Sequence, residues 1–201
     1  AGPPRRGWRP PRPRRVLLVL AHQTSMLVIS LLTLQPRAQL LLRALAGDTA
    51  AVARHLHRGA ALVGAFDLVV SPSLAALSDR LGRRPLMLLA PAAILPVKVA
   101  AALHPTAAVL LLEKVVGDAL RTFGGTTMAF AYFADMFSGE AYTSAIDDLN
   151  TATGLGIVVA PLVSAALQRV AGVRAPFLAA AALAAAHAAL GFAWLEESLA
   201  P

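Results

Sequence analysis

The chain contains 201 residues, of which 57% are hydrophobic and only 14% are charged. Soluble domains carry about 25% charged residues, so this composition predicts a membrane protein and argues against a globular helical bundle. The sequence has no cysteine, which excludes disulfides, thiolate metal sites and thiol catalysis.

Residues 1–15 are expected to form a disordered basic tail, because six arginines lie there among prolines that cannot form a helix interior. Nucleic-acid binding and a transit peptide are alternative explanations of this charge. A basic tail before a hydrophobic segment is more simply explained by the positive-inside rule and by contact with anionic lipid, so we expect no nucleic-acid partner. The chain begins with alanine rather than methionine, and we interpret it as a processed product or a fragment.

Six stretches are long and apolar enough to cross a bilayer, which takes about 20 helical residues. Within a region over 16–199 they cover 16–35, 59–78, 85–103, 106–134, 144–167 and 176–195, and residues 200–201 form a tail. The predicted fold is an all-α membrane protein with six transmembrane helices. Nine Lys and Arg residues lie in the tail and after the second helix, against six after the first, third and fifth, which predicts a cytoplasmic N-terminus.

Two ionisable residues lie at similar depths in the second and third predicted helices. An ion at the bilayer centre costs at least about 2.5 kcal/mol, so each is a functional candidate. Asp67 lies near the middle of its helix and Lys98 in the outer half of the next. We predict either a structural ion pair between them or a role in coupling protons or substrate.

The fourth predicted helix carries a charged stripe. Lys114, Asp118 and Arg121 are spaced by four and three residues, which places them on one helix face, with Glu113 at its border. A charged face cannot lie against lipid, so the stripe is expected to line an aqueous cavity. A purely structural charge network is the alternative.

Other polar positions complete the candidate site. His22 and Gln23 in the first helix and Asn150 in the fifth are pathway candidates, although packing is favoured for His22. The sequence has no nucleophile elbow, HExxH pair or phosphate-binding glycine loop. We therefore expect a protein that is not an enzyme, with no catalytic, metal or cofactor site.

The stretch LSDRLGRRP at residues 77–85 places charge and turn residues between two hydrophobic helices. Gly82 permits a tight turn, and Pro85 suits a first helical position. Asp79 can form charge-assisted hydrogen bonds with the neighbouring arginines, which would hold this turn on the cytoplasmic face.

This stretch resembles the loop signature G-x-x-x-D-R-x-G-R-R of the major facilitator superfamily, which joins the second and third helices of that fold. The matching residues are Asp79, Arg80, Gly82, Arg83 and Arg84. Ala75 stands where the family has its first glycine. The resemblance implies that the loop is a conformational latch, whose acid contacts the other half of a transporter.

Three weaker stretches resemble the drug:proton antiporter and tetracycline-efflux branch of this family. AFAYFADMFSGE (129–140) is similar to the end of its fourth helix, and FLAAAALAAAHAALGFAWLEES (177–198) is similar to its sixth. GLGIVVAPLVSAAL (154–167) is similar to its glycine-rich helix-five motif. The motif positions are Gly154, Gly156 and Pro161.

The resemblance implies a secondary transporter of a small organic solute or drug-like molecule, coupled to protons and working by alternating access. Such transporters have two six-helix halves, and this chain corresponds to the N-terminal one. The expected partners are membrane lipid, substrate, protons, and either a missing C-terminal six-helix half or a second copy of the chain. The alternative is a transport-inactive interaction or regulatory membrane protein that retains half of the fold.

Overall fold

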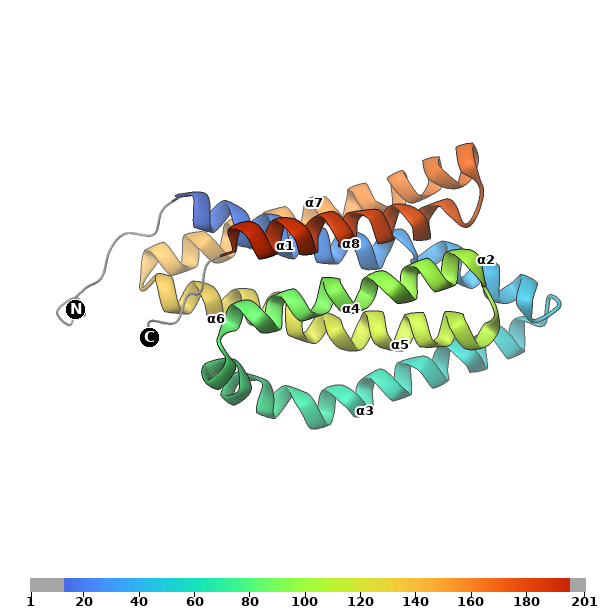
Figure 1. Ribbon diagram of the computed structural model, residues 1–201, viewed down its shortest axis with the longest axis horizontal. Helices are drawn as coiled ribbons and strands as arrows, with labels where there is room; N and C mark the ends of the chain where they lie inside the picture. Colours follow the sequence, from blue (N-terminus) through green and yellow to red (C-terminus); the bar gives the residue numbers. More distant parts are fainter. Residues whose placement is uncertain (1–12, 196–201) are drawn as a thin grey trace.

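A computed structural model describes residues 13–195, which form eight helices and no other regular element (Figure 1). They are α1 (Pro13–Leu32), α2 (Leu34–Ala44), α3 (Thr49–Leu81), α4 (Arg83–Leu103), α5 (Ala107–Gly124), α6 (Thr126–Met136), α7 (Glu140–Ala171) and α8 (Ala175–Trp194). Residues 1–12 and 196–201 lie outside the described residues. They include most of the predicted basic tail and the predicted tail at 200–201.

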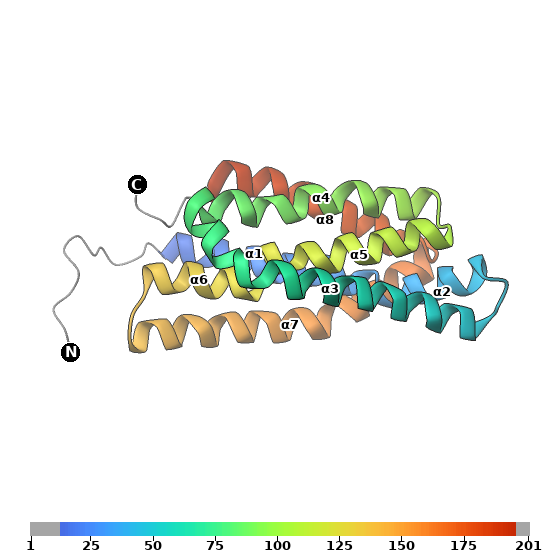
Figure 2. The same cartoon turned by 90° about the horizontal axis from the view of Figure 1, so that it is seen from below.

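The helices form an elongated bundle in which the chain passes back and forth six times (Figure 1 and Figure 2). The pair α1 and α2 makes a single pass, as does the pair α5 and α6, and each other helix makes one. Each predicted span therefore falls on one pass. Both ends of the described chain lie at the same end of the bundle, as an even number of passes requires.

Four of these passes are long and apolar enough to cross a membrane, namely Val16–Ala44, Arg83–Leu103, Glu140–Ala171 and Ala175–Trp194. The passes formed by α3 and by α5 with α6 are not among them. Their place in the membrane therefore stays a prediction.

The sequence predicts uninterrupted helices over 16–35 and 106–134, and this is wrong at two positions. The first pass breaks at Thr33, three residues before Pro36, whose ring nitrogen cannot donate to the preceding turn. The fourth breaks at Gly125, which has extended backbone angles (φ −94°, ψ −162°). A Cβ atom at Gly125 would lie 2.4 Å from the Arg121 carbonyl oxygen, so this conformation requires glycine.

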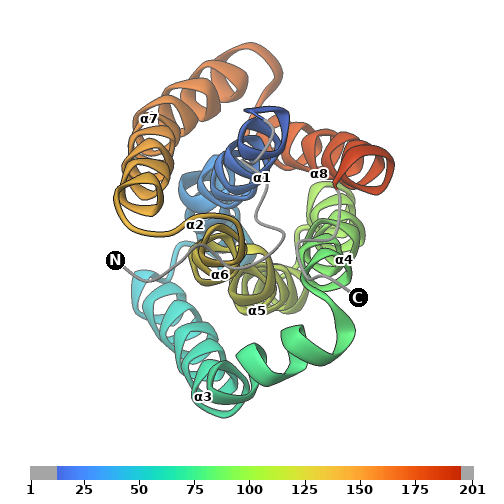
Figure 3. The same cartoon turned by 90° about the vertical axis from the view of Figure 1, so that its left-hand side faces the viewer.

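α1 and α4 make the most extensive helix-to-helix contacts of the bundle. α4 packs on α5 and α8, α1 packs on α7 and α8, and α3 lies along α5. Seen along its long axis, α3 and α7 lie on the outside (Figure 3). Both helices expose large apolar side chains, such as Leu68 at 79% and Leu162 at 66%, which is the pattern of a surface that faces lipid or a partner rather than water.

Candidate functional site

A cavity of about 460 Å³ lies among α1, α3, α5, α6 and α7. Its polar lining residues are Gln23, Asp67, Ser71, Asp118, Arg121, Thr127 and Thr153. Met26, Leu27 and Val63 supply apolar wall. A volume of this size fits a small organic molecule. Most of the lining residues are polar, which suits a polar or ionised molecule.

Four of the predicted pathway residues meet at this cavity. Gln23 comes from α1, Asp67 from α3, and Asp118 and Arg121 from α5. Gly125 also lines it, so the break between α5 and α6 lies in the cavity wall. Irregular backbone at membrane depth is tolerated where it lines a cavity, because water or a ligand can satisfy its polar groups.

Lys114 supports the cavity from outside its lining. Its Nζ donates to Asp118 Oδ2 at 2.8 Å, so the ammonium compensates one of the two lining carboxylates. The Lys114 stem crosses α3 at Gly59, where a Cβ would lie 2.8 Å from the lysine Cδ. Glycine at this position therefore allows Lys114 to lie between α3 and α5.

Lys98 and Glu113 lie in a separate buried cluster with Arg37 and Thr33. Arg37 Nε donates to Glu113 Oε2 at 2.6 Å and its Nη2 to Oε1 at 3.0 Å, a bidentate pair. Lys98 Nζ donates to the same carboxylate and to Thr33 Oγ1, the latter at 2.6 Å. The four residues tie α2, α4 and α5 to the break at Thr33.

This cluster corrects two expectations about charge. Lys98 pairs with Glu113 rather than with Asp67, because Lys98 faces the interior while Asp67 faces the cavity. Glu113 is fully buried and does not border the cavity lining. Sequence reasoning missed Arg37, which lies in the polar stretch between the first two predicted spans, 16–35 and 59–78. Arg43, Arg54 and Arg58 in the same polar stretch are exposed, so the sequence carries no signal that singles out Arg37.

The charged loop forms a turn of one residue, because Gly82 alone separates α3 from α4 at φ +90°. Arg83 is buried and donates to Ser78 Oγ at 2.8 Å, and its Nη2 lies 3.3 Å from Asp79 Oδ1. Its main partner is Asp135 at the end of α6, which binds both Nε and Nη2, the latter at 3.1 Å. Because α4 begins at Arg83, Pro85 is its third residue and not its first.

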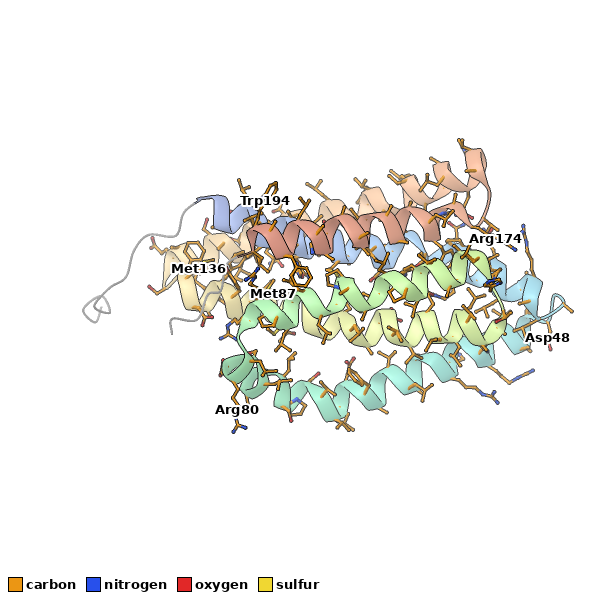
Figure 4. The ribbon with its side chains drawn as sticks, in the orientation of Figure 1. Asp48, Arg80, Met87, Met136, Arg174 and Trp194 are labelled. Carbon is orange, nitrogen blue, oxygen red and sulfur yellow. The ribbon has the colours of Figure 1, made fainter. Side chains whose placement is uncertain are left out.

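The rest of this loop occupies the end of the bundle where the chain enters and leaves. Arg84 Nη2 donates to the Phe192 carbonyl at 2.6 Å, which satisfies an oxygen in the last turn of α8. Arg80 is exposed, and Figure 4 places it at the same end as Met136 and Trp194, opposite Asp48 and Arg174. Ala75 lies on α3, but its side chain is not among those that the structure describes.

The remaining candidates lie away from the cavity lining. His22 Nδ1 and His187 Nε2 are 2.6 Å apart, so one nitrogen donates to the other and joins α1 to α8. Asn150 is exposed on α7, as are Gly154 and Pro161 of the helix-five motif. Gly156 is buried against α1, where its Cβ would lie 3.2 Å from Leu27 Cδ2. The described residues hold no group of three His, Cys, Asp or Glu that could bind a metal ion.

No protein-family model matches this sequence. A stretch of 149 residues, 73% of the chain, is 33% identical to the tetracycline resistance protein, class C, of Escherichia coli and spans 36% of that protein. The fold matches the crystal structure of the human organic anion transporter MFSD10 (TETRAN) with a TM-score of 0.74 at 21% identity, over 96% of this chain and 49% of that one. The chain thus spans half or less of the length of these relatives.

Proposed function

Because the chain belongs to the major facilitator superfamily, a family of membrane transporters and not of enzymes, we propose that it is the N-terminal half of a secondary transporter that carries a small drug-like solute. In this proposal the cavity among α1, α3, α5, α6 and α7 is the solute's path through this half. A relative that confers tetracycline resistance supports a drug-like molecule as the solute.

The observation that carries this proposal is a charged cavity within an apolar helical bundle. Asp67, Asp118 and Arg121 line it, although each costs at least about 2.5 kcal/mol in a bilayer without compensation. Such a cost is sustained where the groups face a water-filled path and act on a solute. The arrangement offers both an acceptor and a donor of charge-assisted hydrogen bonds to a polar or ionised molecule.

Proton coupling is assigned to the two lining carboxylates. Asp67 on α3 and Asp118 on α5 line the same cavity, where each can exchange a proton with cavity water. Lys114, which does not line the cavity, stabilises the ionised form of Asp118 through its hydrogen bond. Protonation of Asp118 would release this lysine and change the contact between α3 and α5.

Alternating access needs a second six-helix unit that moves against this one. In this proposal the exposed apolar side chains of α3 and α7 contact that second unit as well as lipid. The unit is either a C-terminal half or a second copy of the chain. The Asp79–Arg84 loop would act as the latch between the two, with Arg83 and Asp135 holding it rigid on this side.

The transport test uses proteoliposomes with an imposed pH gradient and tetracycline as the probe. Asp67→Asn and Asp118→Asn should abolish pH-driven tetracycline movement, because neither amide can carry a proton. Asp147→Asn is the matched control, since Asp147 is exposed on α7 outside the lining. Unchanged transport in both cavity variants would show that these roles are wrong. If the parent protein, produced together with a C-terminal six-helix half, moves neither tetracycline nor any other solute of a drug-like panel, the transport-inactive alternative holds.

Orientation has its own test, because the chain contains no native cysteine. Ser138 lies in the α6–α7 loop and His104 follows α4, at opposite ends of the bundle. With a cytoplasmic N-terminus, a membrane-impermeant thiol reagent should label His104→Cys in intact cells. Ser138→Cys should react only after the cells are opened, and the reverse pattern would contradict the proposed orientation.

A further inference from the structure

The break between α1 and α2 leaves a backbone oxygen without its usual helical donor. In a continuous helix the Leu32 carbonyl would accept from the N–H of residue 36. Residue 36 is proline, which has no N–H, and both Leu32 and Pro36 are buried. An unsatisfied carbonyl in an apolar interior costs about 1–3 kcal/mol, so this oxygen needs another partner.

Ser164 of α7 supplies that partner. Its Oγ donates to the Leu32 carbonyl at 2.7 Å, and the same hydroxyl accepts from Gln168 Nε2 at 3.3 Å. Ser164 is 1% exposed, so water does not compete for the bond. The hydroxyl of one helix thus replaces the amide that Pro36 removed from another, 132 residues away in sequence.

Small residues let α7 come close enough to make this bond. Gly156, Ala160 and Ser164 follow at intervals of four residues, all buried, and form one face of α7. Gly156 lies against Leu27, which lines the cavity. Thr153, three residues before Gly156, lines the cavity from α7. The position of α7 along the length of α1 therefore sets where Leu27 and Thr153 lie relative to each other in the cavity wall.

We propose that Ser164 is a positioning residue: it supplies the hydrogen-bond donor that Pro36 removes, and so fixes α7 in register on the bend between α1 and α2 at the cavity wall. The small residues of α7 bring its backbone close to α1. The Ser164 bond has a single acceptor, so it selects one register. This role is independent of the transported solute and goes beyond the proposed function.

A double-mutant cycle on the full chain in detergent micelles tests the proposal. Ser164→Ala should lower the ratio of folded to unfolded protein about tenfold, because it leaves the Leu32 carbonyl unsatisfied. In a Pro36→Ala background, where the amide of residue 36 can bond that carbonyl, the same change should cost less than about twofold. Equal losses in both backgrounds would overturn the proposal.

Ser30→Ala is the matched control. Ser30 Oγ donates at 3.2 Å to the Met26 carbonyl within α1, an oxygen that residue 30 can also bond through its own amide. Loss of the Ser30 hydroxyl should change the ratio of folded to unfolded protein less than about twofold. A loss as large as that of Ser164→Ala would show that removal of any serine hydroxyl from these helices has this effect, and would refute the specific role.

A spectroscopic measurement decides the matter if Pro36→Ala does not fold. With a ¹³C=¹⁸O label at Leu32, the carbonyl band should move to higher wavenumber in Ser164→Ala and stay in place in Ser164→Thr, which keeps the hydroxyl. An unmoved band in Ser164→Ala would overturn the proposal. Neither readout depends on transport, so failure here and failure of the proposed function are distinguishable.

Discussion

The buried cluster of Arg37, Lys98 and Glu113 gives the strongest prediction from charge alone. With all three groups ionised, two cations share one carboxylate, and their side-chain exposures are 3%, 1% and 0%. Glu113→Gln removes the only anion of this cluster and leaves two like charges close together in an apolar interior. Lys98→Met removes the excess cation and leaves the bidentate Arg37–Glu113 pair intact.

These two changes should therefore differ widely in free energy. Breaking a buried pair so that charge is left uncompensated costs about 3–5 kcal/mol, and replacing a buried charge by a well-packed apolar side chain is often neutral or stabilising. We expect Glu113→Gln to lose about 3–5 kcal/mol of unfolding free energy. Lys98→Met should lose less than about 1 kcal/mol, since its removal leaves the remaining pair formally neutral.

The assay is equilibrium unfolding in mixed micelles, with helix content as the signal. Arg37→Met is the third arm, and it should lie between the other two because it leaves Lys98 paired but removes the two-bond Arg37 contact. The order Glu113→Gln, Arg37→Met, Lys98→Met, from most to least destabilising, is the signature of net charge. If Lys98→Met costs as much as Glu113→Gln, packing rather than charge dominates and the reasoning is wrong.

Two glycines give further predictions from close contacts in the same unfolding assay. Gly59→Ala should destabilise by about 1–3 kcal/mol because its Cβ would displace the Lys114 stem at 2.8 Å. Gly64 lies in open space on the same helix, so Gly64→Ala should instead stabilise by about 0.5–1 kcal/mol. If the two changes shift the unfolding free energy in the same direction, the contact between Gly59 and Lys114 is contradicted. Gly191→Ala should destabilise because its Cβ would lie 2.4 Å from Leu88 Cδ2, and this loss should largely disappear in a Leu88→Ala background. Additive losses at these two positions would show that α4 and α8 do not meet there.

The sequence by itself determined the class of the molecule and much of its layout. A chain so poor in charge cannot cover a soluble surface, and stretches of about 20 apolar residues predict helices of bilayer length. Gly82 and its arginines mark a turn because turn chemistry is local. The spacing of Asp118 and Arg121 likewise predicts a shared helix face, since helical periodicity depends only on the chain's own geometry.

Only the tertiary structure decided which charges meet. Arg37 resembles other arginines of its polar stretch, and its burial depends on where α4 and α5 place Lys98 and Glu113. Asp135 reaches Arg83, and Ser164 reaches the Leu32 carbonyl, across 52 and 132 residues of sequence. Side-chain spacing along one helix predicts a face but not its neighbour. The partner across each contact follows from how six passes pack together, which no local pattern encodes.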